Sequence, residues 1–284
     1  MSAEAGGSAF VDLHTHSTAS DGTLPPERVI EEAANCGLTA LALTDHDTID
    51  GVRTAREIGD RRGVRVIAGV ELSAYDEDHE VHLLALHLTQ LDALEKRLIE
   101  FRVARRARAG RIVERLNEIG VALTLEDVLQ QSNGGVVGRP HVARAMIARG
   151  VASDFRDAFT RYLGAKGAAF IPRDKLSVVD AIAIAHEAGA IAIWAHPGDG
   201  GRRDRLERLI TAGLDGVEVK HPSHSSEDTK RLQALADFFG LVPSGGSDWH
   251  GAMDGPRRLG MMNVPIEWLE KQDERVATLM SARA

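Results

Sequence analysis

Two histidines one residue apart, His14 and His16, follow a short apolar run at 9–13, and Asp21 stands a few residues later. The run predicts a buried strand, and alternate residues of a strand project to the same side. Both imidazoles can therefore bind one cation through neutral ring nitrogens. The same short pattern also describes two ordinary histidines, so the metal hypothesis depends on the rest of the chain.

Similar residues stand at the ends of the later apolar runs. The full set of candidate metal ligands is His14, His16, Asp21, His46, Glu71, His82, His196, Asp248 and His250. Nitrogen and oxygen ligands without thiolate suit manganese, iron or zinc, and a carboxylate such as Glu71 can bridge two ions. Nine ligands exceed the needs of one ion, so we expect two or three divalent ions per chain. The alternative for each residue is a satisfied core histidine or a capping acid, above all for His82, which lies within its run.

The elements that must position these residues alternate between strand and helix. Strands are expected at 9–13, 38–43, 64–70, 80–88, 190–195, 216–219 and 241–242, and helices at 26–36, 50–62, 178–188 and 227–239, with a closing strand and short helix after 261. Repeated strand–helix units predict an α/β fold with a mostly parallel sheet or barrel, whose site gathers at the carboxyl ends of the strands.

The alternation breaks between residues 92 and 170. Helices are expected there at 92–120, 124–131, 140–149 and 153–163, with Thr124 as a cap before Glu126 and Asp127. We interpret residues 92–170 as a helical insertion that covers the barrel mouth. The barrel is then discontinuous and comprises residues 9–91 and 171–284.

Composition limits the class of protein. The 284 residues are 43% apolar and carry a formal charge of −8 with twelve histidines, and the single Cys36 excludes an internal disulfide. This charge argues against a broad basic face for long nucleic acid but is compatible with a small phosphate-bearing substrate. Without a basic leader or a long uncharged stretch, the chain is expected to be cytoplasmic and not membrane-bound. The sequence leaves the oligomeric state open.

Several motifs together resemble a known family. His14-Thr15-His16, the run 44–47, Glu71, His82, the run 195–198 and the run 246–250 are similar in order and spacing to the motifs of the polymerase and histidinol phosphatase (PHP) superfamily of metal-dependent phosphoesterases. The resemblance covers almost the whole chain. It implies an irregular (β/α)7 barrel of PHP type with a trinuclear site, usually manganese, and it assigns the ligand roles to the nine residues named above.

The insertion narrows the resemblance to one branch. The runs 105–108, 138–141, 172–175 and 221–224 are similar to members that remove the 3′-phosphate from nucleoside 3′,5′-bisphosphates, such as adenosine 3′,5′-bisphosphate to AMP, and that trim short RNA from the 5′ end. The expected partners are therefore a small nucleotide or a short oligoribonucleotide. One departure is Lys220, which stands before His221 where this branch is expected to carry an aromatic residue.

Roles for further residues follow from their chemistry. Metal ions can lower the pKa of a bound water to about 7, which supplies a nucleophile without a serine or cysteine. The leaving oxygen needs a proton, for which we expect His224, then His196, because histidine titrates near the working pH. Guanidinium groups match phosphate, so Arg105, Arg108 and Arg139 are expected to hold the substrate together with Lys175 and His224.

Two other functions remain open from the sequence. One is hydrolysis of histidinol phosphate or another small phosphomonoester. The other is a metal-binding regulatory or proofreading module, against which the complete ligand set and the insertion both argue.

Overall fold

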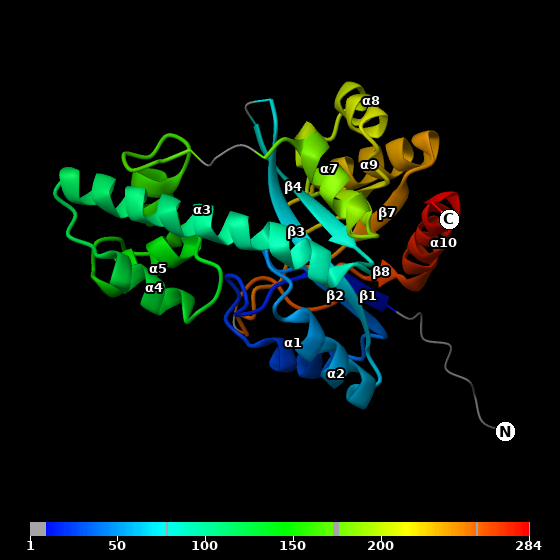
Figure 1. Cartoon of the computed structure of the whole chain (residues 1–284), viewed down its shortest axis with the longest axis horizontal. Coiled ribbons are helices and arrows are strands. Elements are labelled where there is room, and N and C mark those ends of the chain that lie inside the picture. The colour runs from blue at the N-terminus through cyan, green and yellow to red at the C-terminus, as the bar shows by residue number, and fades with distance from the viewer. Residues whose placement is uncertain (1–9, 78, 173–175, 254, 284) are drawn as a thin grey trace.

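A computed structural model describes residues 10–77, 79–172, 176–253 and 255–283. Eight strands form one sheet in the order β7-β6-β5-β4-β3-β2-β1-β8 (Figure 1). The strands are β1 (Phe10–Thr15), β2 (Ala40–Leu43), β3 (Arg65–Asp76), β4 (His79–Leu86), β5 (Ile191–Ala195), β6 (Gly216–Lys220), β7 (Val242–Gly245) and β8 (Val264–Pro265). The sheet is that of a nearly closed α/β barrel, as expected for the PHP type.

Most of the sheet is parallel, but β4 is not. It pairs antiparallel with both neighbours, β3 and β5, while β1 to β3 and β5 to β7 form parallel runs. The two-residue β8 pairs antiparallel with β1. Because β4 returns directly from β3, its register sets His82 opposite Ser73 on one side and Ala195 on the other.

The chain after β7 completes the barrel against β1. The backbone N–H of Asp248 donates to the carbonyl of His14 at 2.9 Å, and that of His16 donates to the carbonyl of Trp249 at 2.9 Å. Residues from the two ends of the barrel sequence are thereby joined at the mouth.

Helices cover the outside of the barrel and form the insertion. They are α1 (Pro26–Asn35), α2 (Val52–Arg62), α3 (Leu91–Glu118), α4 (Leu125–Ser132), α5 (Arg139–Ala148), α6 (Phe155–Ala158), the π-helix η1 (Phe159–Leu163), α7 (Val178–Glu187), the 3₁₀ turn η2 (Gly198–Gly200), α8 (Arg203–Thr211), α9 (Ser226–Phe239) and α10 (Ile266–Arg283). The long helix α3 runs from the barrel out into the insertion, where α4 and α5 pack beside it (Figure 1).

The insertion has an apolar core of its own. Buried side chains from α3, α4, α5 and η1 form a cluster separate from the barrel clusters, including Ile112, Leu116, Val128, Val142, Met146 and Leu163. The first half of α3 packs instead on the barrel through Leu94 and Leu98. We therefore keep the proposed division into a barrel and a cap, which we define as residues 92–170.

Local signals explain where several elements begin and end. Thr124 is the cap of α4, as expected: its side chain accepts a hydrogen bond from the Asp127 backbone N–H, and Asp127 accepts from the Thr124 N–H, which completes a capping box. Gly63 and Gly240 end α2 and α9 with φ of 72° and 65°, a region that glycine enters without steric cost.

Three expectations differ from the structure. Helix α8 was not expected, and α10 has 18 residues and is not short. Strand β3 continues beyond Val70 to Asp76, so Glu71 lies inside the strand and not at its end.

Among the described residues, no helix is both long and apolar enough to cross a membrane.

Candidate metal centre

The nine predicted ligand residues all lie at one end of the barrel. His14 is the fifth residue of β1 and His16 follows that strand directly, and both side chains are buried. Their ring centroids are 5.2 Å apart. The same-side projection predicted from the strand pattern thus places two imidazoles next to each other at the mouth.

Five of the candidate histidines lie around the carboxylate of Glu71. Its Oε2 lies 3.2 Å from Nε2 of His14, 3.2 Å from Nε2 of His16 and 3.2 Å from Nδ1 of His46. Its Oε1 lies 2.7 Å from Nδ1 of His82 and 3.0 Å from Nε2 of His196. Each carboxylate oxygen therefore faces a different set of imidazoles, as a carboxylate bridging two cations must do.

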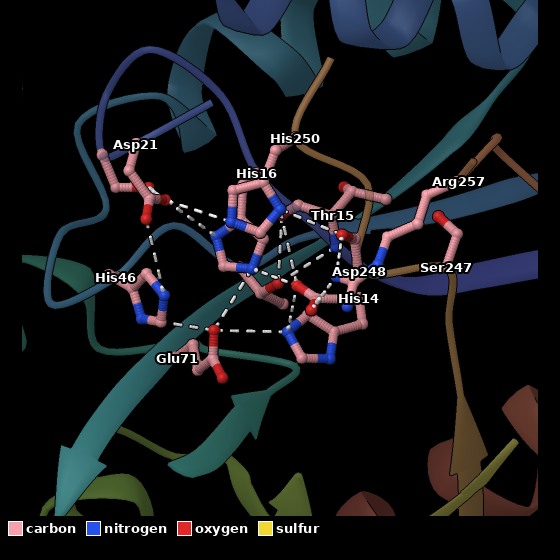
Figure 2. A network of polar contacts seen from close by, with 12 residues as sticks. His14, Thr15, His16, Asp21, His46, Glu71, Ser247, Asp248, His250 and Arg257 are labelled. Atoms are coloured by element: carbon pink, nitrogen blue, oxygen red, sulfur yellow. Dashed lines mark hydrogen bonds and ion pairs between the residues drawn. The ribbon is translucent and has the colours of Figure 1, made fainter. Parts of the chain in front are cut away.

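Two further carboxylates, those of Asp248 and Asp21, lie beside His16 (Figure 2). Oδ1 of Asp248 lies 3.1 Å from Nε2 of His16. Oδ1 of Asp21 lies 3.3 Å from Nε2 of His250, and its Oδ2 lies 4.0 Å from Nε2 of His46. Figure 2 also shows Arg257 beside Asp248, to which its guanidinium donates a hydrogen bond.

Within the described part of the chain, the donor atoms form four compact groups in which all ligand atoms lie within 4.8 Å of one another. These are His16, Asp21, His46 and His250; His14, His16, Glu71 and Asp248; His46, Glu71 and His82; and His14, Glu218 and His221. Eight of the nine predicted ligands enter the first three groups, and the ninth, His196, contacts Glu71 and lies 3.2 Å from His82.

Buried polar atoms without hydrogen bonds test whether a cation would fit. Nε2 of His14, both ring nitrogens of His16, Nδ1 of His46 and Oε2 of Glu71 are buried and make no hydrogen bond within the described part of the chain. Leaving such atoms unsatisfied is costly in a folded protein. Because these atoms are the ones that face the common centre, the residues present fit divalent cations.

The electrostatics of the site agree with this. Burial alone would lower the pKa of His16, but the negatively charged carboxylates of Asp248 and Glu71 close to its ring raise its pKa to about 10. Burial lowers the pKa of His46 to about 3. Burial would raise the pKa of Glu71, yet His46, His82 and His14 hold it well below its usual value. The carboxylates are thus ionised, and they demand positive charge that either imidazolium or a metal can supply.

Buried carboxylates below the ligands hold their backbone in place. Asp45 accepts hydrogen bonds of 2.7 Å from the backbone N–H and the hydroxyl of Ser17 and from the hydroxyl of Ser20. These bonds fix the loop that carries Asp21. Asp12 accepts from the backbone N–H of Ser247 at 2.9 Å and so fixes the residue before Asp248.

The cap also contacts the loop that carries Asp21. The Val136 backbone N–H donates to the carbonyl of Ala19 at 2.9 Å, and Arg144 donates to the carbonyl of Asp21 at 2.6 Å. The insertion is therefore joined by hydrogen bonds to the loop that carries Asp21.

The predicted substrate-binding arginines lie where the cap meets the barrel. Arg105 donates from Nε to Asp47 at 2.5 Å and from Nη2 to the Ser73 hydroxyl at 3.0 Å. Nε of Arg108 donates to the carbonyl of Ile171 at 2.8 Å. The space among Arg105, Arg108 and Arg139 is only about 10 Å³. Lys175 lies outside the described residues.

Arg139 also borders a larger pocket beside the candidate ligands. The pocket measures about 300 Å³ and is lined by Glu80, Val81, His82, Arg139, Trp194, Ala195, His196, Pro197 and Arg205. Nη2 of Arg139 lies 2.9 Å from Oε2 of Glu80. Two guanidinium groups and two candidate metal ligands thus share one cavity.

The predicted general acid, His224, is held by the backbone on both sides of its ring. Its Nδ1 donates to the carbonyl of Val219 at 3.0 Å, and its Nε2 accepts from the N–H of Gly198 at 3.2 Å. It does not belong to any of the four donor groups, whereas His221 does, with Nε2 3.3 Å from Oδ2 of Asp248.

Sequence reasoning missed two residues of this site. Glu218 lies inside the short apolar strand β6, where a single acid gave no motif, although an acid in such a strand is itself a signal of a buried polar contact. His221 was noted in a motif but given no role.

Lys220 stands where an aromatic residue was expected. Its ammonium lies 5.5 Å from the centre of the Trp268 ring and donates to the carbonyl of Asn263.

Comparison with known proteins identifies the class to which this site belongs. The family model for the PHP domain matches residues 12–170. The chain belongs to the PHP domain family, and it is a metal-dependent phosphoesterase.

Three relatives match over most of their length. The chain is 36% identical to the 3′,5′-nucleoside bisphosphate phosphatase of Chromobacterium violaceum, over 89% of this chain and 91% of the relative. It is 35% identical to the 5′-3′ exoribonuclease Rnm of Escherichia coli, over 84% of each. It is 36% identical to the phosphoribosyl 1,2-cyclic phosphate 1,2-diphosphodiesterase of Eggerthella lenta, over 84% of this chain and 94% of the relative.

A solved structure agrees with the fold. A protein of Bifidobacterium adolescentis, described as a candidate metal-dependent phosphoesterase, superposes with a TM-score of 0.86 at 34% identity, over 94% of this chain and 96% of the other.

Proposed function

We propose that this phosphoesterase removes the 3′-phosphate of nucleoside 3′,5′-bisphosphates, such as adenosine 3′,5′-bisphosphate to AMP, and also trims short RNA from its 5′ end. The observation that carries the proposal is the pocket of about 300 Å³ in which Arg139 lies beside His82 and His196. A substrate with two phosphates needs one anchoring place at the metals and another at a cation outside them. This pocket offers the second place directly beside the first.

The metal ligands in this proposal are the nine residues predicted from the sequence. His14, His16, Glu71 and Asp248 would hold one divalent ion, Asp21, His46 and His250 a second, and Glu71, His82 and His196 a third. Hard oxygen donors with imidazoles suit Mn²⁺, with iron or zinc as alternatives. Such ions activate a water molecule and clamp phosphoryl oxygens during in-line displacement.

Cationic side chains of the protein would bind the phosphate that is retained. Arg139 would bind the retained 5′-phosphate with a bidentate fork, and Arg105 and Arg108, packed behind it, would add positive charge. Lys175 keeps its proposed role as a further point charge. Glu80 forms an ion pair with Arg139. The incoming phosphate would displace Glu80 from this pair.

The leaving ribose oxygen needs a proton donor, and His224 comes before His196 as the candidate, because a ring nitrogen that binds an ion cannot also donate a proton. Nδ1 of His224 donates to the carbonyl of Val219 and its Nε2 accepts from the N–H of Gly198, so rotation of the ring would bring a nitrogen to the substrate. His196 lines the pocket and stays the second candidate, for a state in which it does not bind an ion.

A rival substrate comes from the relative that cleaves a phosphoribosyl 1,2-cyclic phosphate. That relative is as similar as the bisphosphate phosphatase, at 36% identity. Both substrates carry on ribose a phosphate besides the one that reacts, so one arginine pocket would serve either. Histidinol phosphate, with a single phosphate, would leave the pocket around Arg139 without a function.

The test is a comparison of substrates with added Mn²⁺. We expect adenosine 3′,5′-bisphosphate to give AMP and phosphate with a far higher kcat/KM than 3′-AMP, 5′-AMP or histidinol phosphate. The cyclic phosphate and a short 5′-phosphorylated RNA are assayed beside it. Faster turnover of the cyclic phosphate would replace the proposed substrate, and no turnover of the bisphosphate would exclude it.

The role of Arg139 is tested separately. Losing one charge-assisted contact costs about 1.5–3 kcal/mol, or roughly ten- to a hundredfold in kcat/KM. Arg139→Ala should lose this factor on the bisphosphate and change hydrolysis of a simple aryl phosphate little. Arg149→Ala is the matched control, because Arg149 pairs with Asp127 on the surface of the cap. Equal losses on both substrates would place Arg139 at the reacting phosphate.

A further inference from the structure

Glu218 is a carboxylate that no part of the proposed chemistry uses, yet it lies directly beneath the candidate metal centre. It is the third residue of β6, and its side chain has no solvent exposure. Its neighbours Val217 and Val219 pack outward into the apolar cluster shared with the covering helices. By strand alternation Glu218 therefore points into the barrel.

The two oxygens of Glu218 contact two different candidate ligands. Oε1 lies 3.0 Å from Nδ1 of His14, which belongs to β1. Oε2 accepts a hydrogen bond of 2.7 Å from the backbone N–H of His196, which follows β5. One side chain from β6 thus joins residues that come from opposite parts of the chain.

The contact with His14 decides which ring nitrogen faces the metal centre. A carboxylate accepts, so Nδ1 of His14 must carry the proton of this hydrogen bond. In the neutral imidazole this leaves Nε2 as the free donor of an electron pair. Nε2 lies 3.2 Å from Oε2 of Glu71 and 3.4 Å from Oδ1 of Asp248, as a ligand to the same cation should.

The contact with His196 holds an unfavourable backbone conformation. His196 has φ of 31°, in the left-handed region that residues other than glycine seldom adopt. Such a conformation costs about 1–3 kcal/mol and persists only where surrounding contacts enforce it. The hydrogen bond from the His196 N–H to Glu218 is a contact of this kind, and it directs the ring toward Glu71 and His82.

We propose that Glu218 is a positioning residue that orients the ligands of two metal ions at once, His14 through its ring and His196 through its backbone. The inference rests on the proposed metal-binding role of these histidines. It differs from a reading in which Glu218 is itself a ligand, together with His14 and His221. In that reading Nδ1 of His14 would face an ion and could not donate to Glu218.

Glu218→Gln in the full chain tests the proposal by metal binding, without reference to turnover. Competition with a chromophoric chelator gives the affinity for Zn²⁺ and Mn²⁺, and elemental analysis at saturating metal gives the number of ions. We expect the same number of ions as in the wild type, held about 10- to 100-fold more weakly, as found when partners of metal-binding histidines are lost.

Asp215→Asn is the matched control. Asp215 is a fully buried carboxylate that contacts a histidine, His186, at 2.8 Å and accepts from the backbone N–H of Ala192 at 2.9 Å. Like Glu218 it contacts a histidine and a backbone N–H, it also pairs with Arg275, and none of its partners is among the nine candidate ligands. We expect this variant to lose stability in urea while its metal affinity, measured on the folded protein, stays within about twofold of the wild type.

A measurement on the wild type does not depend on whether the variant folds. In the Zn²⁺ form, long-range ¹H–¹⁵N correlation spectra of protein labelled on histidine nitrogen should show His14 protonated at Nδ1, with its signals assigned from His14→Gln. Protonation at Nε2, loss of one whole ion in Glu218→Gln, or unchanged affinity in that variant would each overturn the proposal. A wild type that binds no metal would instead overturn the proposed metal centre.

Discussion

Glu71 shows how much of this site depends on single residues. Its side chain is buried, and five imidazole nitrogens lie within 3.2 Å of its two oxygens. No other described carboxylate lies beside as many of the predicted histidine ligands. A single carboxylate in this place sets the spacing of the groups around it, and its removal would separate them.

Asp248 gives the clearest test at this scale. We expect Asp248→Asn to abolish phosphoester hydrolysis while leaving the fold intact, because a neutral amide is a much poorer ligand for a hard cation than a carboxylate. The replacement keeps the size of the side chain, so packing around Asp12 and Trp249 should not change. Turnover with Mn²⁺ and urea unfolding in chelator measure the two properties. Retained activity would remove Asp248 from the site.

Strand ends were the most predictable elements because chemistry and hydrophobic pattern coincide there. The apolar runs before His14, His46 and His196 gave β1, β2 and β5 within two residues of their observed bounds. The extension of β3 past Glu71 was not predicted, because Ser73 and Asp76 interrupt the apolar run and the strand there is completed by pairing with β4. That pairing is a tertiary contact, which local sequence does not contain.

Other features of the fold could not be predicted from the sequence, for physical reasons. Helix α8 buries only Leu206 and Leu209, so its sequence is mostly charged and resembles a loop. The chemistry of the ligands could be predicted from their types, but the contacts of Glu218 and Arg105 could not. These depend on how the barrel closes and where the cap rests, and each is set by residues far apart in the chain.

Helix α5 provides a prediction for pH dependence. Its residue His141 is buried, and Nδ1 accepts a hydrogen bond from the backbone N–H of Gly138 at 3.0 Å. Burial lowers the pKa of His141 to about 4, and the charges of Arg144 and Arg105 act in the same direction. The folded cap therefore keeps this ring neutral well below its ordinary titration range.

The sign of the effect follows from linkage. Between about pH 6.5 and 4 the unfolded chain binds a proton at His141 that the folded chain does not, so acidification favours unfolding by up to about 1.4 kcal/mol per pH unit. Above pH 6.5 the contribution of His141 is constant. His141→Gln keeps a hydrogen-bond acceptor for Gly138 and cannot titrate, so its stability should fall less between pH 6.5 and 4. Urea unfolding in chelator at each pH compares the two proteins, and equal slopes would contradict the prediction.

The turn before α5 tests how the cap holds the Asp21 loop. A Cβ atom at Gly135 would lie 2.3 Å from the carbonyl oxygen of Thr18, far inside contact distance. Gly135→Ala should therefore push the turn away from the loop, at a cost of about 1–3 kcal/mol in unfolding free energy, and weaken metal binding at Asp21. Urea unfolding and metal titration measure both effects.

Gly110→Ala is the control for that substitution. Gly110 lies within α3, and a Cβ atom there meets nothing within 4 Å. Alanine should stabilise this helix by roughly 0.5–1 kcal/mol. If both variants behaved alike, contact between the turn and the loop would not be the cause.

The charge of the whole molecule is negative, but its distribution matters more than its sum. The formal charge is −8, and the carboxylates of Asp21 and Glu71, which are buried, lie at the barrel mouth together with that of Asp248, which is partly buried. A phosphate ester would be repelled from such a mouth without added positive charge. The arginines along the boundary between cap and barrel supply part of this charge, and the proposed cations supply the rest.

Metal binding should therefore be coupled to the stability of the whole chain. Because the ligands lie in or shortly after the six strands β1, β2, β3, β4, β5 and β7, ions join the complete barrel, and unfolding must release them. Any ligand that binds only the folded state stabilises it by RT ln(1 + [L]/Kd), about 2.7 kcal/mol per ion at a free concentration 100 times Kd.

We expect two or three ions per chain by elemental analysis after growth with manganese. We also expect urea unfolding to need several kcal/mol more with Mn²⁺ than with chelator. In Asp248→Asn this difference should shrink, because one ion loses a ligand while the rest of the barrel is unchanged. One ion or fewer per chain, or an unfolding free energy that does not respond to Mn²⁺, would contradict a centre that joins six strands through several ions.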